Sequence, residues 1–318
     1  MAHEHEHHHD YKCTHGHEHG HSHSHAPKNF EKAFAVGIAL NLIFVIIEVA
    51  FGFYSNSLAL LADAGHNLSD VLGLLLAWGA TVLARRIPSK RHTYGLRRSS
   101  ILAALLNATI LLIVVGGIAW EAIRRFATPT TVDSFSMMWV ACLGIFINGF
   151  TAWLFMSGKK EDLNIRGAYL HMLADAVVSL GVVLSAVAIY YTNWVWLDPV
   201  VSLTIVVVIM FGTWGLLKES LQLALDAVPS HIKPDQVFSY LSSLPGVIAV
   251  HDLHIWAMST TETALTAHLV KPDAKIDDAL LSDIKEHLEH HFNISHTTIQ
   301  FELGDISHPC EQAPNDKV

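Results

Sequence analysis

The sequence predicts an all-α membrane bundle of six helices, followed by a small α+β domain. Hydrophobic residues make up 51% of the 318 residues and charged residues 15%, whereas a soluble protein carries about 25% charged residues. Apolar runs of about 20 residues, long enough to cross a hydrocarbon core roughly 30 Å thick, fill most of the first two thirds of the chain. Beyond residue 217 they give way to shorter alternating segments.

The first 29 residues form a low-complexity segment rich in histidine. Eleven of the 23 histidines lie between His3 and His25, interleaved with Glu, Gly and Ser. Such a composition cannot bury a core, so we expect residues 1–29 to be a disordered tail when metal is absent. Because only three of the histidines are consecutive, a native metal-gathering tail is favoured over an expression tag. The segment lacks the order of regions typical of a signal peptide, and we expect no cleavable one.

The six predicted helices form one domain, residues 30–217. We expect the helices at residues 33–54, 58–84, 99–124, 135–157, 164–191 and 196–217. An even number of spans places both ends of the domain on one side of the membrane. Basic residues gather in two connecting loops, namely Arg85, Arg86, Lys90, Arg91, Arg97, Arg98, Lys159, Lys160 and Arg166. The opposite side offers only Arg124 and Arg125. Because loops rich in Lys and Arg stay inside, both termini are predicted to be cytoplasmic.

Residues 218–305 are predicted to form a separate soluble domain in the cytoplasm. The residue pattern predicts a helix, two strands, a helix and a strand, at 231–244, 247–259, 263–271, 277–292 and 297–303. This α-β-β-α-β order suggests a small ferredoxin-like domain. Residues 306–318 are expected to form a C-terminal tail. The three cysteines, Cys13, Cys142 and Cys310, lie far apart and form neither a CxxC pair nor a disulfide framework.

Two of the predicted membrane helices carry a histidine and an aspartate four residues apart. These pairs are His66 with Asp70 and His171 with Asp175. Residues i and i+4 lie on one face of a helix, so each helix presents an imidazole beside a carboxylate. An aspartate at the centre of a membrane helix costs about 2.5–3.5 kcal/mol and usually marks an ion pathway. One pair alone could equally be a structural hydrogen bond, but two copies with the same spacing favour a metal site.

The donor atoms of these two pairs favour zinc. Two imidazole nitrogens and two carboxylate oxygens suit a tetrahedral zinc ion. Calcium takes more oxygen ligands, and copper(I) prefers thiolates or thioethers. The pattern therefore predicts a divalent metal site that prefers zinc to manganese or cadmium. No basic stripe is present, so we expect no nucleic-acid partner.

Several short motifs resemble those of the cation diffusion facilitator family. They are the two H-x-x-x-D helices, S-L-A-L-L-A-D-A-G-H before the first pair, H-T-Y-G in the first basic loop, D-P at 198–199 and H-D-L-H-I-W at 251–256. The resemblance covers about residues 30–303 and is closest to the zinc-transporting bacterial members and to eukaryotic zinc transporters. It implies a homodimer in the lipid bilayer that exchanges zinc for protons, with both His–Asp pairs as ligands. Members with D-x-x-x-D as the first pair accept other divalent metals, so His66 implies zinc selectivity.

The same resemblance implies weaker metal sites outside the membrane. In the cytoplasmic domain it carries over His251, His268 and Glu302 as ligands, whereas Gln300 stands where some members have another histidine. Some members also bind metal in the first cytoplasmic loop through an acidic residue and two histidines. This chain has only His92 there, with Ser89 and Leu96 near the other positions, so His92 is expected to act at most as a single extra ligand.

Other polar residues are given structural roles. The histidines at 287, 290 and 291 form the sequence H-L-E-H-H, which matches neither the H-E-x-x-H nor the H-x-x-E-H spacing of metalloproteases. We expect them to lie on the polar face of a helix. The intramembrane polar groups are expected to make hydrogen bonds between helices rather than to bind metal. These groups are Asn41, Glu48, Asn107 and Asn148.

These residues are compatible with three functions. Zinc binds neutral imidazole and ionised carboxylate, so loading releases protons and a proton gradient can empty the site without ATP. The leading hypothesis is therefore a zinc/proton antiporter that exports Zn²⁺ from the cytoplasm and is not an enzyme. An intramembrane metalloprotease would need a general-base Glu beside the zinc ligands. A zinc-sensing membrane protein without transport would not need ligands at the membrane midplane. The short loops favour a bacterial cytoplasmic membrane.

Overall fold

The computed structural model describes residues 28–84, 86–156, 163–273, 278–305, 307 and 310–313, without the side chains of residues 28–35 and 163–165. Residues 1–27 of the predicted tail lie outside the described residues, as do Arg85, Lys159 and Lys160 of the basic loops.

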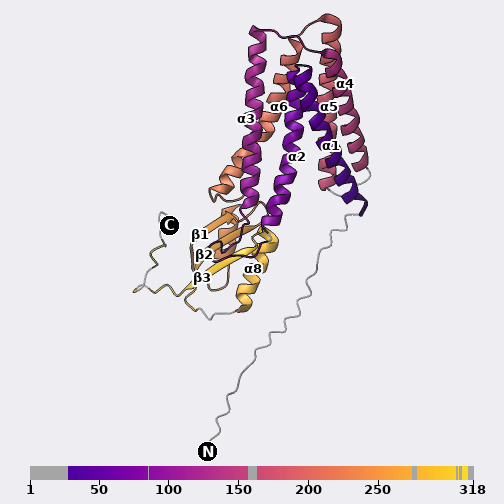
Figure 1. The fold of residues 1–318 in the computed structure, drawn as a ribbon. Helices are drawn as coiled ribbons and strands as arrows, with labels where there is room; N and C mark the ends of the chain where they lie inside the picture. The colour runs from indigo at the N-terminus through magenta and orange to yellow at the C-terminus, as the bar shows by residue number, and fades with distance from the viewer. Residues whose placement is uncertain are drawn as a thin grey trace, which may run out of the picture.

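Six long helices form an elongated bundle, as the apolar runs predict (Figure 1). They are α1 (Lys28–Tyr54), α2 (Leu58–Ala84), α3 (Ser99–Ala127), α4 (Ser134–Phe155), α5 (Leu163–Thr192) and α6 (Leu197–Ala224). Each is long and apolar enough to cross a membrane. The sixth helix ends at Ala224 rather than at residue 217, because Lys218 and Glu219 continue it beyond the apolar run. The start of α1 and the end of α6 lie at the end of the bundle nearest the small domain (Figure 1).

The outer surface of the bundle is apolar. Trp78, Ile113, Phe146 and Phe211 are between 69% and 76% exposed, although each would gain about 1.5–3 kcal/mol from burial. Lipid chains remove this cost, so these side chains belong to the surface that faces the bilayer. Most of the interior is one packed cluster to which α1, α2, α3, α4, α5 and α6 all contribute, and a smaller cluster of Ala152, Phe155 and Met172 joins α4 to α5.

A buried aspartate ties three helices together at the end of the bundle away from the small domain. Asp198 of α6 accepts hydrogen bonds from Ser57 Oγ (2.6 Å), Leu58 N (2.9 Å) and Ala59 N (3.2 Å) at the start of α2. These contacts satisfy backbone N–H groups that a helix N-terminus leaves without partners. Arg125 of α3, itself buried, lies 3.5 Å from the same carboxylate. Asp198 therefore fixes the outer end of α2 relative to α3 and α6.

The absence of a side chain at Gly144 lets α4 approach α1 and α5 closely. A Cβ atom at this position would lie 2.6 Å from Cζ of Phe44 and 2.9 Å from Oγ of Ser179. Both separations are shorter than packed heavy atoms tolerate, because van der Waals contact between carbon atoms begins at about 3.5 Å. Gly144 thus sets the distance between these three helices.

The soluble domain has the predicted α-β-β-α-β order. Its elements are α7 (Pro234–Ser242), β1 (Ala249–Ala257), β2 (Thr263–Val270), α8 (Asp278–Phe292) and β3 (His296–Glu302). The sheet order is β1-β2-β3, with β1 antiparallel and β3 parallel to β2. Leu265, Ala267 and Leu269 of β2 are buried in one cluster with Leu241 of α7 and Leu288 of α8. Since strand side chains alternate in direction, His268 points to the opposite face of the sheet.

Strand register gathers polar side chains on that opposite face. His251 of β1 pairs with His268 of β2, and His268 pairs with Gln300 of β3. Glu302 follows two residues later and therefore shares this face. A bulge between His251 and His254 contains Asp252, whose φ of 50° lies in the left-handed region.

Polar contacts join the bundle to the soluble domain. Arg97, just before α3, lies 2.8 Å from the Glu262 carboxylate in the β1–β2 turn. Ser100 Oγ accepts a hydrogen bond from Thr260 N (3.1 Å) in the same turn. Arg98 pairs with Asp226, which follows α6. The β1–β2 turn therefore sits directly beneath α3.

Candidate metal centres

Two clusters of metal-ligating side chains occur in the described part of the chain, one in the bundle and one on the sheet. In the bundle, α2 and α5 face each other at the two H-x-x-x-D motifs. His66, His171 and Asp175 each offer a ligand atom within 4.8 Å of the others. Asp70 Oδ2 lies 3.0 Å from Nε2 of His171 and 3.8 Å from Nε2 of His66. The structure therefore brings all four predicted residues together.

The separations in this cluster suit a small tetrahedral ion. The Asp175 carboxylate lies 3.4 Å from His66 Nε2 and 3.6 Å from His171 Nε2. Ligand atoms about 2.0–2.1 Å from a tetrahedral zinc are roughly 3.3 Å apart. The nitrogen–oxygen distances between the two helices already bracket this value. The cluster can hold such an ion with only small movements of the side chains.

The bundle cluster is open towards the end that carries the soluble domain. A cavity of about 340 Å³ reaches Asp70 and His171, and its other walls include Asn41, Phe155 and Met172. Phe155 and Met172 lie in the halves of α4 and α5 nearest the soluble domain, and Asn41 lies at the middle of α1. A second cavity, of about 300 Å³, reaches the cluster between α2, α3, α5 and α6.

The other side of the cluster is packed. Asp63, one turn from His66 towards the outer end of α2, is fully buried, as are Leu60 and Ala62. Glu48 of α1 is also fully buried and accepts a hydrogen bond from Asn67 Nδ2 (2.9 Å). The site is thus open on one side and closed on the other.

The intramembrane polar groups mostly bond between helices, as predicted. Glu48 bonds to α2 through Asn67, and Asn107 of α3 donates to Ser69 Oγ of α2 (3.3 Å). Asn41 of α1 donates to the sulfur of Met172 in α5 (3.6 Å). Asn148 differs, because neither atom of its buried amide has a hydrogen-bond partner among the described residues.

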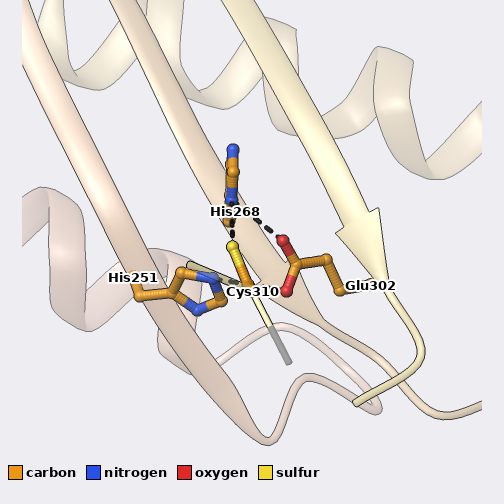
Figure 2. A group of neighbouring side chains, drawn as sticks. All are labelled: His251, His268, Glu302 and Cys310. Atoms are coloured by element: carbon orange, nitrogen blue, oxygen red, sulfur yellow. Dashed lines mark hydrogen bonds and ion pairs between the residues drawn. The ribbon is translucent and has the colours of Figure 1, made fainter. Parts of the chain in front are cut away.

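The second cluster lies on the open face of the sheet. Figure 2 shows His251, His268, Glu302 and Cys310 converging from three strands and the segment after β3. Glu302 lies 2.9 Å from His268 Nδ1 and 3.3 Å from His251 Nε2. Cys310 Sγ lies 3.6 Å from His268 Nδ1. Ligand atoms of the four residues all lie within 4.8 Å of one another.

Cys310 was missed by the sequence reasoning, which placed it in a C-terminal tail. Cys310 instead lies against the sheet, with its thiol beside His268 (Figure 2). Burial and the neighbouring carboxylates of Glu302 and Asp252 raise the pKa of the Cys310 thiol. The only available signal in the sequence was a cysteine a few residues after a strand that ends in a ligand.

The donor set of the sheet cluster fits zinc. Two imidazoles, one thiolate and one carboxylate are all ligands that zinc accepts. His251 Nε2 is buried and makes no hydrogen bond to a described residue, although the Glu302 carboxylate lies 3.3 Å away. A shared cation between these two atoms would satisfy both of them. Around the four, Asp252 lies 3.5 Å from His268 Nε2, and Gln300 Nε2 donates to Glu302 Oε1 (3.2 Å). Gln300 therefore orients a ligand rather than supplying one.

The remaining sequence candidates belong to neither cluster. His92 is exposed in the loop before α3, where its backbone bonds to Ser89. His287 of α8 stacks on Tyr240 of α7, with ring centroids 3.8 Å apart, and His291 packs 4.2 Å from it. Partial burial and His291 lower the pKa of His287. This is the polar helical face that the sequence predicts.

Comparison with known proteins identifies the family. The profile of the cation efflux transmembrane domain matches residues 34–223, and that of the cation efflux protein cytoplasmic domain matches residues 229–303. The chain belongs to the cation efflux, or cation diffusion facilitator, family. It is therefore a multi-pass membrane transporter with a cytoplasmic C-terminal domain, and the metalloprotease hypothesis is wrong.

Individual relatives of this cation efflux protein match over most of their length. The cation efflux system protein CzcD of Alcaligenes sp. is 39% identical over 90% of both chains. The zinc transporter ZitB of Escherichia coli is 38% identical over 87% of both chains. The cadmium, cobalt and zinc/H⁺–K⁺ antiporter of Bacillus subtilis is 36% identical over 83% of this chain and 86% of the relative.

Proposed function

We propose that this cation efflux protein exports Zn²⁺ from the cytoplasm in exchange for protons. The observation that carries the proposal is that two imidazoles and two carboxylates meet well inside the spans of α2 and α5. These residues are His66, Asp70, His171 and Asp175. A metal bound there is the transported substrate. Relatives named as zinc transporters or as antiporters of zinc and protons support this assignment.

The ligand atoms support zinc as the substrate. Nitrogen and oxygen ligands in a four-coordinate site fit zinc, whereas manganese prefers a site of six oxygens. Cobalt and cadmium, which the name of the Bacillus subtilis relative includes, bind similar ligands and are expected to be carried less well.

Proton exchange follows from the same ligands. The imidazoles and carboxylates bind zinc only when they are deprotonated, so zinc and protons compete for the same atoms. Zinc loading from the cytoplasm releases protons there. Protons from the other side then displace zinc outward once the site opens to that side. The inner cavity, which reaches Asp70 and His171, is the entry route for zinc from the cytoplasm.

The sheet cluster would hold a resident zinc ion rather than the cargo. His251, His268, Glu302 and Cys310 would be its ligands, and Zn²⁺ there would join β1, β2 and β3 to the segment after β3. We further propose that the protein works in a bacterial cytoplasmic membrane, since the relatives named above are bacterial. The match of the cytoplasmic domain to the family's domain supports the proposal that it works there as a homodimer. Glutaraldehyde cross-linking in native membranes, followed by denaturing electrophoresis, tests for the dimer.

The test of the transport site uses single alanine variants of His66, Asp70, His171 and Asp175 in inside-out vesicles. With an imposed proton gradient and a fluorescent zinc indicator inside, each variant is expected to lose zinc uptake while keeping the elution volume and melting temperature of the parent. His290→Ala, an imidazole in neither cluster, is the matched control and should transport normally. Uptake at the parent rate by the four variants would show that zinc takes another route.

The same experiment decides between transport and zinc sensing. A sensor without transport binds zinc through the sheet cluster and gives no proton-driven zinc flux in the unaltered protein. In that case, zinc binding would survive in Asp175→Ala and would be lost in His268→Ala, while no uptake would be seen with either protein.

A further inference from the structure

Two buried carboxyl groups meet in the bundle on the closed side of the transport cluster. Glu48 of α1 and Asp63 of α2 are both fully buried, and their side chains are within hydrogen-bond contact of each other. Asp63 precedes His66 by about one helical turn towards the outer end of α2. The pair therefore lies between the transport cluster and the outer surface.

The two carboxyl groups lack one hydrogen-bond donor between them. Oε2 of Glu48 accepts from Asn67 Nδ2 (2.9 Å), and Oδ2 of Asp63 accepts from Ser179 Oγ (3.1 Å). Oε1 of Glu48 and Oδ1 of Asp63 receive a hydrogen bond from no described donor. An ionised carboxylate only accepts hydrogen bonds, so two ionised groups could not bond to each other. A single proton on either group supplies the missing donor.

Among the described residues, no lysine or arginine pairs with these carboxyls. On α2, the neighbours are Asn67 and, one turn from Asp63, His66. On α5, they are Ser179 and the carboxylate of Asp175. The sequence of α4 contains no acidic or basic residue, and Arg125 of α3 is engaged with Asp198 at the outer end of the bundle. Two like charges in contact inside a membrane cannot both remain ionised without such a partner.

We propose that Glu48 and Asp63 share one proton in the zinc-free protein and give it up when zinc loads the transport cluster. The proposal deepens the proposed zinc/proton exchange and depends on it. It makes the pair a second proton carrier, separate from the zinc ligands, so that the coupling does not depend on the metal ligands alone.

The step balances in charge. Before loading, the pair carries one proton and one negative charge. A zinc ion at His66 and Asp175 adds two positive charges close to Asp63, and these favour the fully ionised pair. The O–H bond of the shared carboxyl breaks, and the proton leaves towards the cytoplasm, the side to which the cluster is open. After zinc departs outward, one proton from the outer side restores the O–H bond.

The first measurement counts protons in the purified full-length protein. Zinc titration calorimetry in two buffers with different ionisation enthalpies gives the number of protons released per zinc. In Glu48→Gln the amide can donate to Asp63 in place of the shared proton, so the fold is retained. The variant should release about one proton fewer per zinc than the parent. Zinc bound by the sheet cluster contributes equally to both proteins and cancels in the difference.

The second measurement observes the proton directly. Infrared difference spectra of the parent should show a protonated carboxyl C=O band that disappears on zinc addition and is missing in Glu48→Gln and Asp63→Asn. Glu121→Gln, a carboxylate-to-amide control at the outer end of α3, should keep the parent's band and proton count. If Glu48→Gln does not fold, the parent spectrum and Asp63→Asn decide the question.

The outcomes separate this proposal from the proposed function. If the parent exchanges zinc for protons but Glu48→Gln releases the same number of protons, the shared proton is not coupled to transport. A carboxyl band that persists with bound zinc would likewise overturn the proposal, because the proton would then be structural. A parent protein that shows no zinc flux would instead refute the proposed function.

Discussion

His66 determines how strongly the transport cluster favours nitrogen-binding metals. Its Nε2 atom lies 3.4 Å from the Asp175 carboxylate of α5. Replacing His66 with Asp exchanges this nitrogen for oxygen and makes the donor set harder. We expect the preference for zinc over manganese and cadmium to fall roughly tenfold, a size typical of changes at metal sites.

The measurement for His66→Asp is competitive uptake of the three metals at equal free concentrations. Asn107→Asp, which adds a carboxylate to the same cavity without changing a ligand, is the control. Unchanged metal ratios in His66→Asp would place selectivity outside the four ligands.

Cys310 is predicted to contribute to zinc affinity in the sheet cluster. In an Asp175→Ala background, which disables the transport site, Cys310→Ser should weaken zinc binding at least roughly tenfold, because even residues that only orient a ligand contribute this much. Competition with a zinc chelator measures the change. Cys142→Ser, at an exposed cysteine on α4, should have no effect. An equal affinity in Cys310→Ser would show that three ligands suffice.

These residues also show what the sequence could and could not predict. Spacing within one helix was enough for His66 with Asp70 and His171 with Asp175, because four residues define a helical face. Cys310 and Asp252 were not predictable in this way. Cys310 lies beyond the last strand and joins the cluster through a tertiary contact with His268, and Asp252 joins it through a β-bulge. Sequence spacing does not encode either feature.

At the scale of elements, the N-terminus of α2 depends on one residue of α6. Asp198→Ala removes the acceptor for Ser57 Oγ, Leu58 N and Ala59 N. It also removes the buried carboxylate that pairs with Arg125, which keeps the partly exposed Glu121 carboxylate at 3.6 Å. Breaking a buried pair in this way costs about 3–5 kcal/mol. Thermal unfolding in detergent should therefore show a large loss of stability.

A second helix start provides the control for this prediction. Asp133 caps α4 through Ser136, and the Ser136 hydroxyl lowers the pKa of Asp133. Its removal should cost only about 1 kcal/mol, the usual value of an exposed cap. Equal losses in Asp133→Ala and Asp198→Ala would mean that the buried network contributes no more than a simple cap.

The helices and strands were predicted well because long apolar runs and alternating segments are local patterns. The end of α6 was not, since Lys218 and Glu219 leave the hydrocarbon but not the helix. The contacts of Arg97 with Glu262 and of Ser100 with Thr260 could not be predicted either. They join residues more than 150 positions apart and depend on how the two domains pack.

At the scale of the whole molecule, the histidine-rich N-terminal segment precedes the cytoplasmic end of α1. A polar chain of 29 residues spans on the order of 30 Å, which would keep bound zinc near the inner cavity at raised local concentration. Deleting residues 2–25 should therefore raise the zinc concentration needed for half-maximal uptake and leave the maximal rate nearly unchanged. Uptake into inside-out vesicles across buffered free zinc concentrations measures both quantities.

The control for the deletion replaces residues 2–25 with a Gly/Ser segment of equal length, which retains the chain but not the imidazoles. It should behave as the deletion does. A collapse of the maximal rate in both proteins would make the tail part of the transport machinery instead of a zinc buffer.

Gly144 links the packing of the bundle to how the protein can diverge. It allows Phe44 and Ser179 to approach α4, and Ser179 in turn holds Asp63. In a lineage that acquires alanine at position 144, the new Cβ atom would push Ser179 away from the Asp63 carboxyl. A smaller side chain at position 44 or 179 would relieve this clash. Positions 44, 144 and 179 should therefore drift together among descendants of this gene, although none of the three touches the cargo.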